Sequence, residues 1–324
     1  MKMVKIITAV CWCIVALVLI GFCGWVLTGT IFGHNVNFGF SGILSGGDGL
    51  VGEYLQVGEY SISAQGIDSL NIDWVSGEVS VTPYDGDEIK MTEYARRELK
   101  DGEQLKLRSS GGTVSVDYFE RQRIMRINAP AKKLEVLVPR GLCENMNSLV
   151  VDVVSATVTV SGMNAGKFSI DTVSGRCDVS DITAQTFKMN STSGSLTASS
   201  VNADKITVDT TSGRITFSET KARELSGDTT SGTQEYSGMF DIVNIDSVSG
   251  KISIDSAEIP SSLKTDTTSG SVTVTIPDGG EITVNHDSIS GSFSSDIPVT
   301  MKNGSAQFRF SSTSGSVKIY KAAA

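Results

Sequence analysis

The sequence predicts an all-β fold: a parallel β-solenoid, or β-helix, of about ten rungs with a repeat of roughly 19–20 residues, preceded by one transmembrane helix. Three observations predict this fold. A short motif recurs at a nearly constant spacing, apolar and polar residues alternate on both sides of it, and a long uncharged run stands near the amino terminus. A period of about 20 residues is typical of solenoids, in which each repeat buries its apolar side by stacking on its neighbours.

The recurring motif begins as SIDTVSG at 169–175 and returns seven more times, with small changes, down to RFSSTSG, which ends at Gly315. The serine of its Ser-Gly pair falls at 174, 193, 212, 231, 249, 269, 290 and 314, and a degenerate copy places Ser155 nineteen residues before the first. Apolar residues occupy the sixth position before this serine and most of the third and fifth positions after it. This alternation has period two and is rich in Val, Ile, Thr and Phe, so each repeat predicts a strand, a Ser-Gly corner and a second strand.

A looser segment follows the second strand of each repeat. We expect it to carry a third inward residue eight positions after the serine, as at Ile182, Val201 and Met239. The sixth position before the serine should form an inward ladder through Phe187, Ile206 and Leu225, with its sequence neighbours facing outward.

We interpret the motif residues as structural corner residues. An aspartate three positions before the serine would accept backbone N–H bonds, and the glycine would supply conformational freedom. The predicted corner residues are Asp171, Ser174, Gly175, Asp209, Ser212, Gly213, Asp228, Ser231, Gly232, Asp246, Ser249, Gly250, Asp266, Ser269 and Gly270. A ladder of carboxylates also suggests calcium, but the glycine-rich nonapeptide of calcium-binding β-rolls is absent from this chain. We therefore predict no metal site.

The amino-terminal segment, residues 1–28, predicts a cytoplasmic stub and a membrane anchor. Residues 6–27 carry no charge and, as a helix, would span about 33 Å, enough for the hydrocarbon core. Lys2 and Lys5 precede this run, which places the amino terminus in the cytoplasm and the bulk of the chain outside it. A cleaved signal peptide and a lipoprotein signal at Cys23 are the alternatives, but the run is long for a signal peptide and Phe22 is bulky for a lipoprotein site.

Three further segments follow the anchor. Residues 29–58 are rich in glycine and predict a flexible tether. Residues 59–150 predict an irregular β cap of the solenoid, which begins with a corner at Ser76-Gly77, and residues 151–324 predict the regular repeats. Two cysteines, Cys143 and Cys177, lie outside the anchor, where either a disulfide or buried free thiols would fit.

Composition and motifs argue against several classes of function. The net charge is −9, and no basic stripe or aromatic platform predicts nucleic-acid binding. One short basic run, Arg121, Arg123, Arg126, Lys132 and Lys133, predicts a solvated strand face or a contact with an anionic polymer. HExxH, GxSxG, GxGxxG and P-loop motifs are absent, and His286 stands where other repeats carry apolar residues. We therefore predict no enzyme, no catalytic residue and no cofactor.

The uncharged amino-terminal run, the entry strand LEVLVPRG and the D-T-x-S-G repeats resemble the bacterial putative-adhesin family of uncharacterised β-helical domains, over residues 67–320. The resemblance implies an envelope protein held by one amino-terminal helix, and it implies no active site. The expected function is a membrane-anchored, extracytoplasmic, non-catalytic display module that binds an envelope polymer or a membrane protein. An accessory protein of an envelope-stress sensing system is the alternative, and a polysaccharide-active β-helix enzyme is the third candidate.

Overall fold

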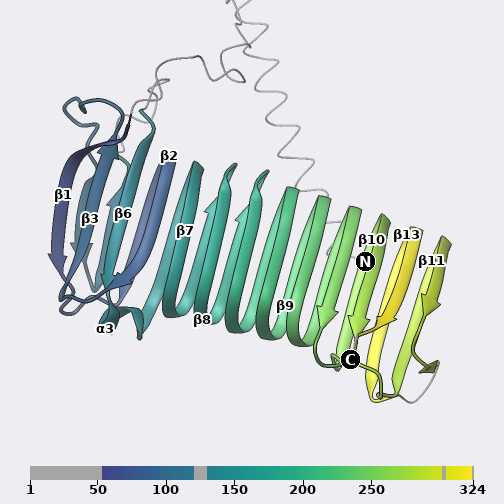
Figure 1. Ribbon diagram of the computed structural model, residues 1–324. Coiled ribbons are helices and arrows are strands. Elements are labelled where there is room, and N and C mark those ends of the chain that lie inside the picture. The colour runs from purple at the N-terminus through teal and green to yellow at the C-terminus, as the bar shows by residue number, and fades with distance from the viewer. Residues whose placement is uncertain (1–52, 120–129, 301–303, 323–324) are drawn as a thin grey trace, which may run out of the picture. The chain divides into compact units, whose positions relative to one another are not determined.

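The computed structural model describes residues 53–119, 130–300 and 304–322, and these form one extended, open β-sheet of stacked rungs (Figure 1). The predicted anchor, and the predicted tether up to residue 52, lie outside the described residues. The end of the predicted tether, 55–58, belongs instead to the first strand, because β1 starts at Leu55. In the part of the chain that the structure describes, no helix has the length and apolar character to cross a membrane.

In the described residues, strands make up nearly all of the regular structure, and one short helix interrupts them. In chain order the elements are β1 (Leu55–Ser63), β2 (Ser69–Tyr84), β3 (Glu88–Ala95), β4 (Lys106–Ser110), β5 (Thr113–Asp117), β6 (Lys132–Pro139), α3 (Arg140–Cys143), β7 (Met146–Thr172), β8 (Arg176–Ser191), β9 (Ser195–Ser256), β10 (Ser262–Ile276), β11 (Ile282–Ser295), β12 (Val299–Thr300) and β13 (Ala306–Lys321). The all-β prediction is confirmed, and β9 is long because it continues through several rungs and their corners.

The amino-terminal end of the sheet is antiparallel. β1 pairs with β3, and β3 pairs with β6, both antiparallel, whereas β6 pairs with β2 in parallel. A hairpin of β4 and β5, turned by Gly111 and Gly112 with φ of 59° and 79°, lies along the first half of β2. The second edge of β2 pairs with β7, and Ser76 aligns with Ser155 there. β2 is therefore already a rung of the regular stack.

The regular rungs pair in parallel at the repeat spacing. Phe168 of β7 aligns with Phe187 of β8, which aligns with Ile206 of β9. These three side chains are 0–1 % exposed. The predicted inward residues that follow the corner, such as Leu196, Ile215, Ile252 and Val272, are also buried. The inward register that the repeat predicts is thus confirmed, and the core is one continuous stack of apolar side chains.

The corner glycines are required by the closeness of neighbouring rungs. A Cβ atom added to Gly194, Gly213 or Gly232 would collide with the backbone carbonyl oxygen of the corner glycine one rung earlier. At the other repeat glycines, an added Cβ would likewise collide with the carbonyl oxygen of the residue at the same corner position on the adjacent rung. None of these three has a positive φ, so the lack of a side chain, rather than conformational freedom, explains the glycine.

A buried row of hydroxyl groups lies two positions before each corner serine. Its members are Thr172, Ser191, Thr210, Thr229, Ser247 and Thr267, each at most 8 % exposed. The Thr210 hydroxyl lies 3.0 Å from the place that a Cβ of Gly213 would take, and Thr267 lies 2.9 Å from the equivalent place at Gly270. The hydroxyl therefore fills the space that the missing side chain leaves inside the corner.

The last two rungs are stacked out of chain order. β13, the last strand that the structure describes, pairs with β10 on one side and with β11 on the other, and is therefore inserted between them (Figure 1). All these pairs are parallel and keep the motif aligned, as Ser269, Ser314 and Ser290 show. A regular solenoid stacks its repeats in chain order, and this sheet departs from that order at its last two rungs.

Two other details differ from the sequence-based expectation or resolve it. Met239 is 37 % exposed, and the next residue, Phe240, is 3 % exposed and takes the inward place. The spacing between the serines on either side, Ser231 and Ser249, is one residue shorter than the usual nineteen, so the inward position shifts in this repeat. Cys143 and Cys177 are both buried and free.

Candidate functional site

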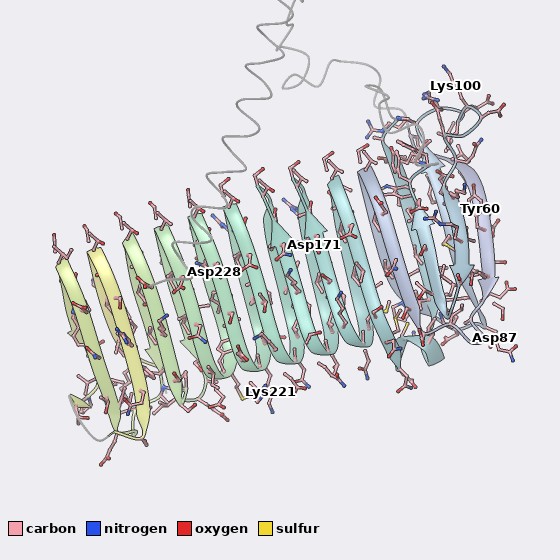
Figure 2. All side chains as sticks on the ribbon, turned by 180° about the vertical axis from the view of Figure 1, so that it is seen from behind. Tyr60, Asp87, Lys100, Asp171, Lys221 and Asp228 are labelled. Atoms are coloured by element: carbon pink, nitrogen blue, oxygen red, sulfur yellow. The ribbon has the colours of Figure 1, made fainter. Side chains whose placement is uncertain are left out.

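The outward aspartates of the repeat form a ladder on one face of the sheet, which we call the acidic face. Asp73 aligns with Asp152 across β2 and β7, and Asp246 aligns with Asp266 across β9 and β10. Figure 2 shows Asp171 and Asp228 on this face, on separate rungs. The full set is Asp73, Asp152, Asp171, Asp209, Asp228, Asp246, Asp266 and Asp287, with Asn190 and Ser311 in the same row. Because neighbouring rungs lie about 4.8 Å apart, the carboxylates are close enough to interact.

Partial burial and mutual repulsion raise the pKa of several of these carboxyl groups. Desolvation, followed by the charge of the neighbouring aspartate, raises the pKa of both Asp228 and Asp246 to about 6. Desolvation also raises the pKa of Asp209 and of Asp152, the latter with contributions from Asp171 and Asp73. The face therefore holds carboxyl groups that are easier to protonate than free aspartates, and a cation placed over them would relieve their repulsion.

The aspartates of the ladder have contacts both between rungs and within a rung. The Asn190 amide donates to the Asp171 carboxylate of the preceding rung, and the Ser169 hydroxyl donates to Asp171 at 3.2 Å. The corner N–H groups of Ser174, Ser193 and Ser212 donate to backbone carbonyls of the preceding corner, at 2.8–2.9 Å. These three donors have backbone acceptors, so a role for the aspartates as acceptors of corner N–H groups stays a prediction.

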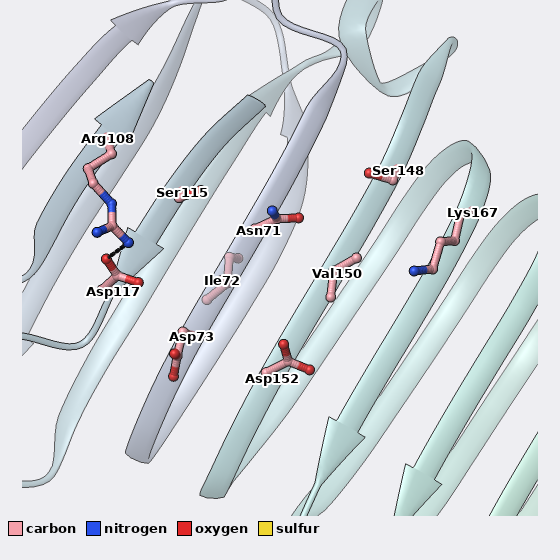
Figure 3. Close-up of a pocket in the computed structure, with 10 residues that line it drawn as sticks. All are labelled: Asn71, Ile72, Asp73, Arg108, Ser115, Asp117, Ser148, Val150, Asp152 and Lys167. Carbon is pink, nitrogen blue, oxygen red and sulfur yellow. Dashed lines mark ion pairs between the residues drawn. The ribbon is translucent and has the colours of Figure 1, made fainter. Parts of the chain in front are cut away.

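A groove opens at the end of the acidic face nearest the amino-terminal strands, with a volume of about 410 Å³ (Figure 3). It forms because the first half of β2 has β5 on one side and β7 on the other. Arg108 forms an ion pair with Asp117 at one wall, Asp152 and Lys167 lie toward the other, and Asp73 lies between them on β2. The remaining lining residues are Asn71, Ile72, Ser115, Ser148 and Val150. The groove is polar, with both signs of charge.

The sequence did not single out Arg108, Asp117 or Lys167 as site residues. Arg108 and Asp117 lie on the β4–β5 hairpin, and Lys167 lies about fifty residues further along the chain. Their meeting depends on the hairpin pairing beside β2, for which the repeat pattern holds no information. The sequence feature that could have indicated the groove is the presence of charged residues on a hairpin that interrupts the repeat.

The short basic run is not a uniform solvated face. Lys132 is fully buried, and its ammonium group lies 2.7 Å from the Glu93 carboxylate, which is also fully buried. The Lys132 ammonium also donates to the Glu103 and Tyr118 carbonyls and lies 3.9 Å from the centre of the Tyr118 ring. The prediction of a solvated face is therefore wrong for Lys132. Arg121, Arg123 and Arg126 lie outside the described residues, and Lys133 forms a partly exposed ion pair with Glu135.

The Glu93 carboxylate has a full set of partners. The Leu105 N–H group donates to both its oxygens at 3.1 Å, and the Tyr60 hydroxyl donates to one of them at 3.3 Å. Desolvation lowers the pKa of Lys132, although the charge of Glu93 opposes this effect. A buried ion pair whose remaining donors and acceptors are also bonded is a structural device, and it ties β3, β6 and the 103–105 segment together.

A ridge of branched side chains borders the acidic face, one position before each corner serine. Val154, Val173, Val248 and Ile289 are exposed on it by 48, 50, 45 and 85 %. Threonines occupy this position in other repeats, as at Thr211. An outward row of aliphatic groups beside a row of carboxylates gives this side of the molecule a repeated amphipathic surface.

The described residues offer no grouping typical of a metal centre. Among them, no three histidine, cysteine, aspartate or glutamate side chains are grouped so as to hold a metal ion. His286 lies at the last rung, where its ring contacts Phe293 at a centroid distance of 5.5 Å. The chemistry that the acidic face and its groove offer is reversible polar and ionic contact.

Comparison with known proteins gives a consistent result. The family model described as Toastrack DUF4097 matches residues 67–320. None of the curated proteins matches the chain. Among solved structures, a putative adhesin from Parabacteroides distasonis ATCC 8503 is similar, with a TM-score of 0.55 and 12 % identity over 83 % of this chain and 98 % of that one. A putative lipid binding protein from the same organism has a TM-score of 0.53 and 12 % identity over 81 % of this chain and 96 % of that one. At this identity the likeness shows the fold alone.

Proposed function

Because the chain belongs to the Toastrack DUF4097 family and shares its fold with proteins called a putative adhesin and a putative lipid binding protein, we propose that it is a non-catalytic binding module of the bacterial cell envelope. Its expected ligand is an envelope polymer or a membrane protein. The chain would be held in the membrane by residues 1–28, with the amino terminus in the cytoplasm and the rungs outside.

The observation that carries this proposal is the repeated, outward-facing set of polar groups on the acidic face. Carboxylates recur at most rungs along the sheet, and the groove ends the same row. A periodic surface of this kind suits a ligand that is itself extended, because each rung adds one more weak contact and the contacts act together. A compact substrate that needs one catalytic constellation would gain little from this repetition.

A binding assay with matched variants tests the function. Full-length protein in native membranes is incubated with purified envelope polymer, and the retained fraction is measured. Neutralising three carboxylates of the acidic face, Asp209→Asn, Asp228→Asn and Asp246→Asn, should lower the retained fraction several-fold. The control neutralises three carboxylates that lie after the corner, on the second strand of their rungs: Asp178→Asn, Glu235→Gln and Asp255→Asn. Equal retention by both triple variants would contradict a role for the acidic face.

A protease assay tests the topology. Protease added to intact cells should digest the part of the chain after residue 50, while the first residues stay protected. Digestion only after the cells are broken, or a mature protein that begins near residue 30, would contradict an uncleaved anchor with external rungs.

The alternative function is an accessory protein of an envelope-stress sensing system. The exposed ridge beside the acidic face favours it, because a protein partner would bury aliphatic groups and contact carboxylates together. Capture of a stoichiometric membrane protein from native membranes, with no retention by purified polymer, would support the accessory role over the polymer-binding role.

A further inference from the structure

The exchanged order of the last two rungs has a cause in their inward residues. In the aligned rungs, His286 of β11 stands where β13 has Phe310, and Ser295 of β11 stands where β13 has Ile319. Phe310 and Ile319 are 0 and 1 % exposed. β13 therefore carries large apolar residues at both inward positions, whereas β11 carries two polar residues there. The interior rung of β10 has the small buried Thr265 and the apolar Val274 at these positions.

β11 also closes the core at its end of the stack. The Ser295 hydroxyl donates to the Ile297 carbonyl at 2.8 Å and accepts the Ile297 N–H bond at 3.3 Å. This tight turn ends β11, and the Asp296 N–H group donates back to the Ile319 carbonyl at 2.9 Å. Ile297 itself is 6 % exposed. The turn thus places one apolar side chain in the core at the rung where the stack ends.

The end rung gives the His286 side chain both an aromatic contact and partial access to solvent. Its ring lies 5.5 Å from that of Phe293, and Phe293 lies 6.4 Å from Phe310 of the interior rung. His286 is partly exposed, as an end rung permits, whereas the same residue between two rungs would bury a polar ring among apolar side chains. Inward-pointing charged residues are a known way to keep the edge of a sheet from pairing further, and an inward polar residue acts in the same direction because a further rung would bury it.

We infer that β11 is a stop rung: its inward His286 and Ser295 assign it to the end of the stack and keep that end from adding a further rung from a second copy of this chain. Only Ile282 and Thr283 of its outer edge pair with β12 in the described part of the chain, so the motif segment 285–291 presents an edge there. Its motif is the same one that aligns every other pair of rungs, and an apolar β11 would therefore be a template for another copy.

The rung order is tested with cysteine pairs in the full-length protein. Thr273 aligns with Lys318, and Lys318 aligns with Ser294. Neighbouring strands bring Cα atoms within disulfide range, whereas strands separated by a rung do not. The pair Thr273→Cys with Lys318→Cys should form an intrachain disulfide, mapped by peptide mass spectrometry, and the pair Thr273→Cys with Ser294→Cys should not. A disulfide in the second pair and none in the first would overturn the assigned order.

The stop function is tested by making β11 apolar. The double variant His286→Phe with Ser295→Ile also carries Asn285→Cys, which reports contact between two copies as a disulfide dimer on a non-reducing gel. We expect several-fold more dimer than with Asn285→Cys alone. The matched control adds an apolar residue to the outward side of the same rung, Ser294→Ile with Asn285→Cys, and should give no increase.

A folding check keeps this test decisive. The disulfide between residues 273 and 318, introduced into the double variant without Asn285→Cys, should still form if the interior rungs are intact. If that disulfide forms, the interior rungs of the double variant are intact. An unchanged amount of dimer in the version that carries Asn285→Cys would then overturn the stop function. The 273/294 cysteine pair is introduced separately into the same double variant. Loss of the 273–318 disulfide in the first protein with formation of the 273–294 disulfide in the second would show that the two inward residues decide the rung order, as the inference states.

Discussion

The rings of Phe168 and Phe187 lie parallel on adjacent rungs, with centroids 4.9 Å apart and 2° between their planes. Ile206 continues the same row on the next rung at 0 % exposure. The row is a single apolar column in which each side chain is covered by the one before and the one after. Its members therefore depend on one another for burial, and a charge placed within the column has no route to water.

Ile206→Asp should destabilise the protein severely, by several kcal/mol, because it buries a carboxylate among apolar neighbours. The control is the adjacent Lys205→Ala. Lys205 is exposed and forms an ion pair with Glu224 at 2.7 Å, and such a surface pair contributes at most about 1 kcal/mol. Denaturant unfolding of both variants measures the difference. Equal midpoints would show that the inward register is misassigned.

Gly213→Ala should cost about 1–3 kcal/mol, because the new methyl group meets the Gly194 carbonyl and the Thr210 hydroxyl and forces the two rungs apart. Gly141→Ala is the matched control, since nothing lies within 4 Å of a Cβ at that helical position. Thermal unfolding of the two variants gives the comparison. If Gly213→Ala were as mild as the control, the close approach of the corners would not be a constraint.

Lys132→Met should destabilise by about 3–5 kcal/mol, because it leaves the Glu93 carboxylate buried without its counter-charge. The double variant Lys132→Met with Glu93→Leu removes both charges and should recover much of that loss. Lys133→Met, which breaks only the partly exposed pair with Glu135, should change stability by less than about 1 kcal/mol. Additive effects of the two single substitutions in the double variant would argue against direct coupling of Lys132 and Glu93.

The acidic face should make stability fall as the pH rises. The folded-state pKa of Asp246 is about 6, above the value of about 3.9 for an unfolded chain, so the folded state binds extra protons between these values. The resulting penalty is absent below about pH 4 and complete above about pH 6. Asp246→Asn should therefore raise the melting temperature at pH 7.5 relative to the parent, and this gain should shrink toward pH 4.

The opposite sign is expected at Asp278, whose pKa is lowered by its hydrogen bond to Lys321. Asp278→Asn should give no gain at pH 7.5. For Asp246→Asn, a loss of stability that is equal at both pH values would favour an uncharged hydrogen-bonding role. A rise in the parent's melting temperature with millimolar calcium would show that a bound cation offsets the repulsion of the carboxylates.

Much of the fold follows from the sequence, because the repeat carries both the period and the inward register. Phe187 and Ile206 are buried where the alternation places them. The alternation failed at Met239, because the shortened repeat moves the inward position to Phe240. The exchange of β11 and β13 was not predicted, since both carry the same motif and would pair equally well by their backbones. His286 and Ser295 were the available indication, as polar residues at inward positions.

The surface was less predictable than the core. The outward aspartates were visible as a periodic row, but their raised pKa values depend on distances between rungs. The groove arises where the β4–β5 hairpin lies beside β2, a pairing outside the repeat. Lys132 was predicted to be solvated together with its basic neighbours, although the alternation along the strand turns Lys132 inward and Lys133 outward. Its partner Glu93 lies 39 residues earlier, and no local sequence pattern predicts that this carboxylate is buried.

The insertion of β13 between β10 and β11 bears on how the protein is made. Both neighbours of β13 precede it along the chain, so during synthesis neither the second edge of β10 nor β11 has its native partner rung until the residues up to 321 have left the ribosome. Until then β10 ends the nascent stack with an open apolar edge. Completion of this end is therefore a late, all-or-none event, and a chain interrupted before residue 306 would expose that edge to other nascent chains.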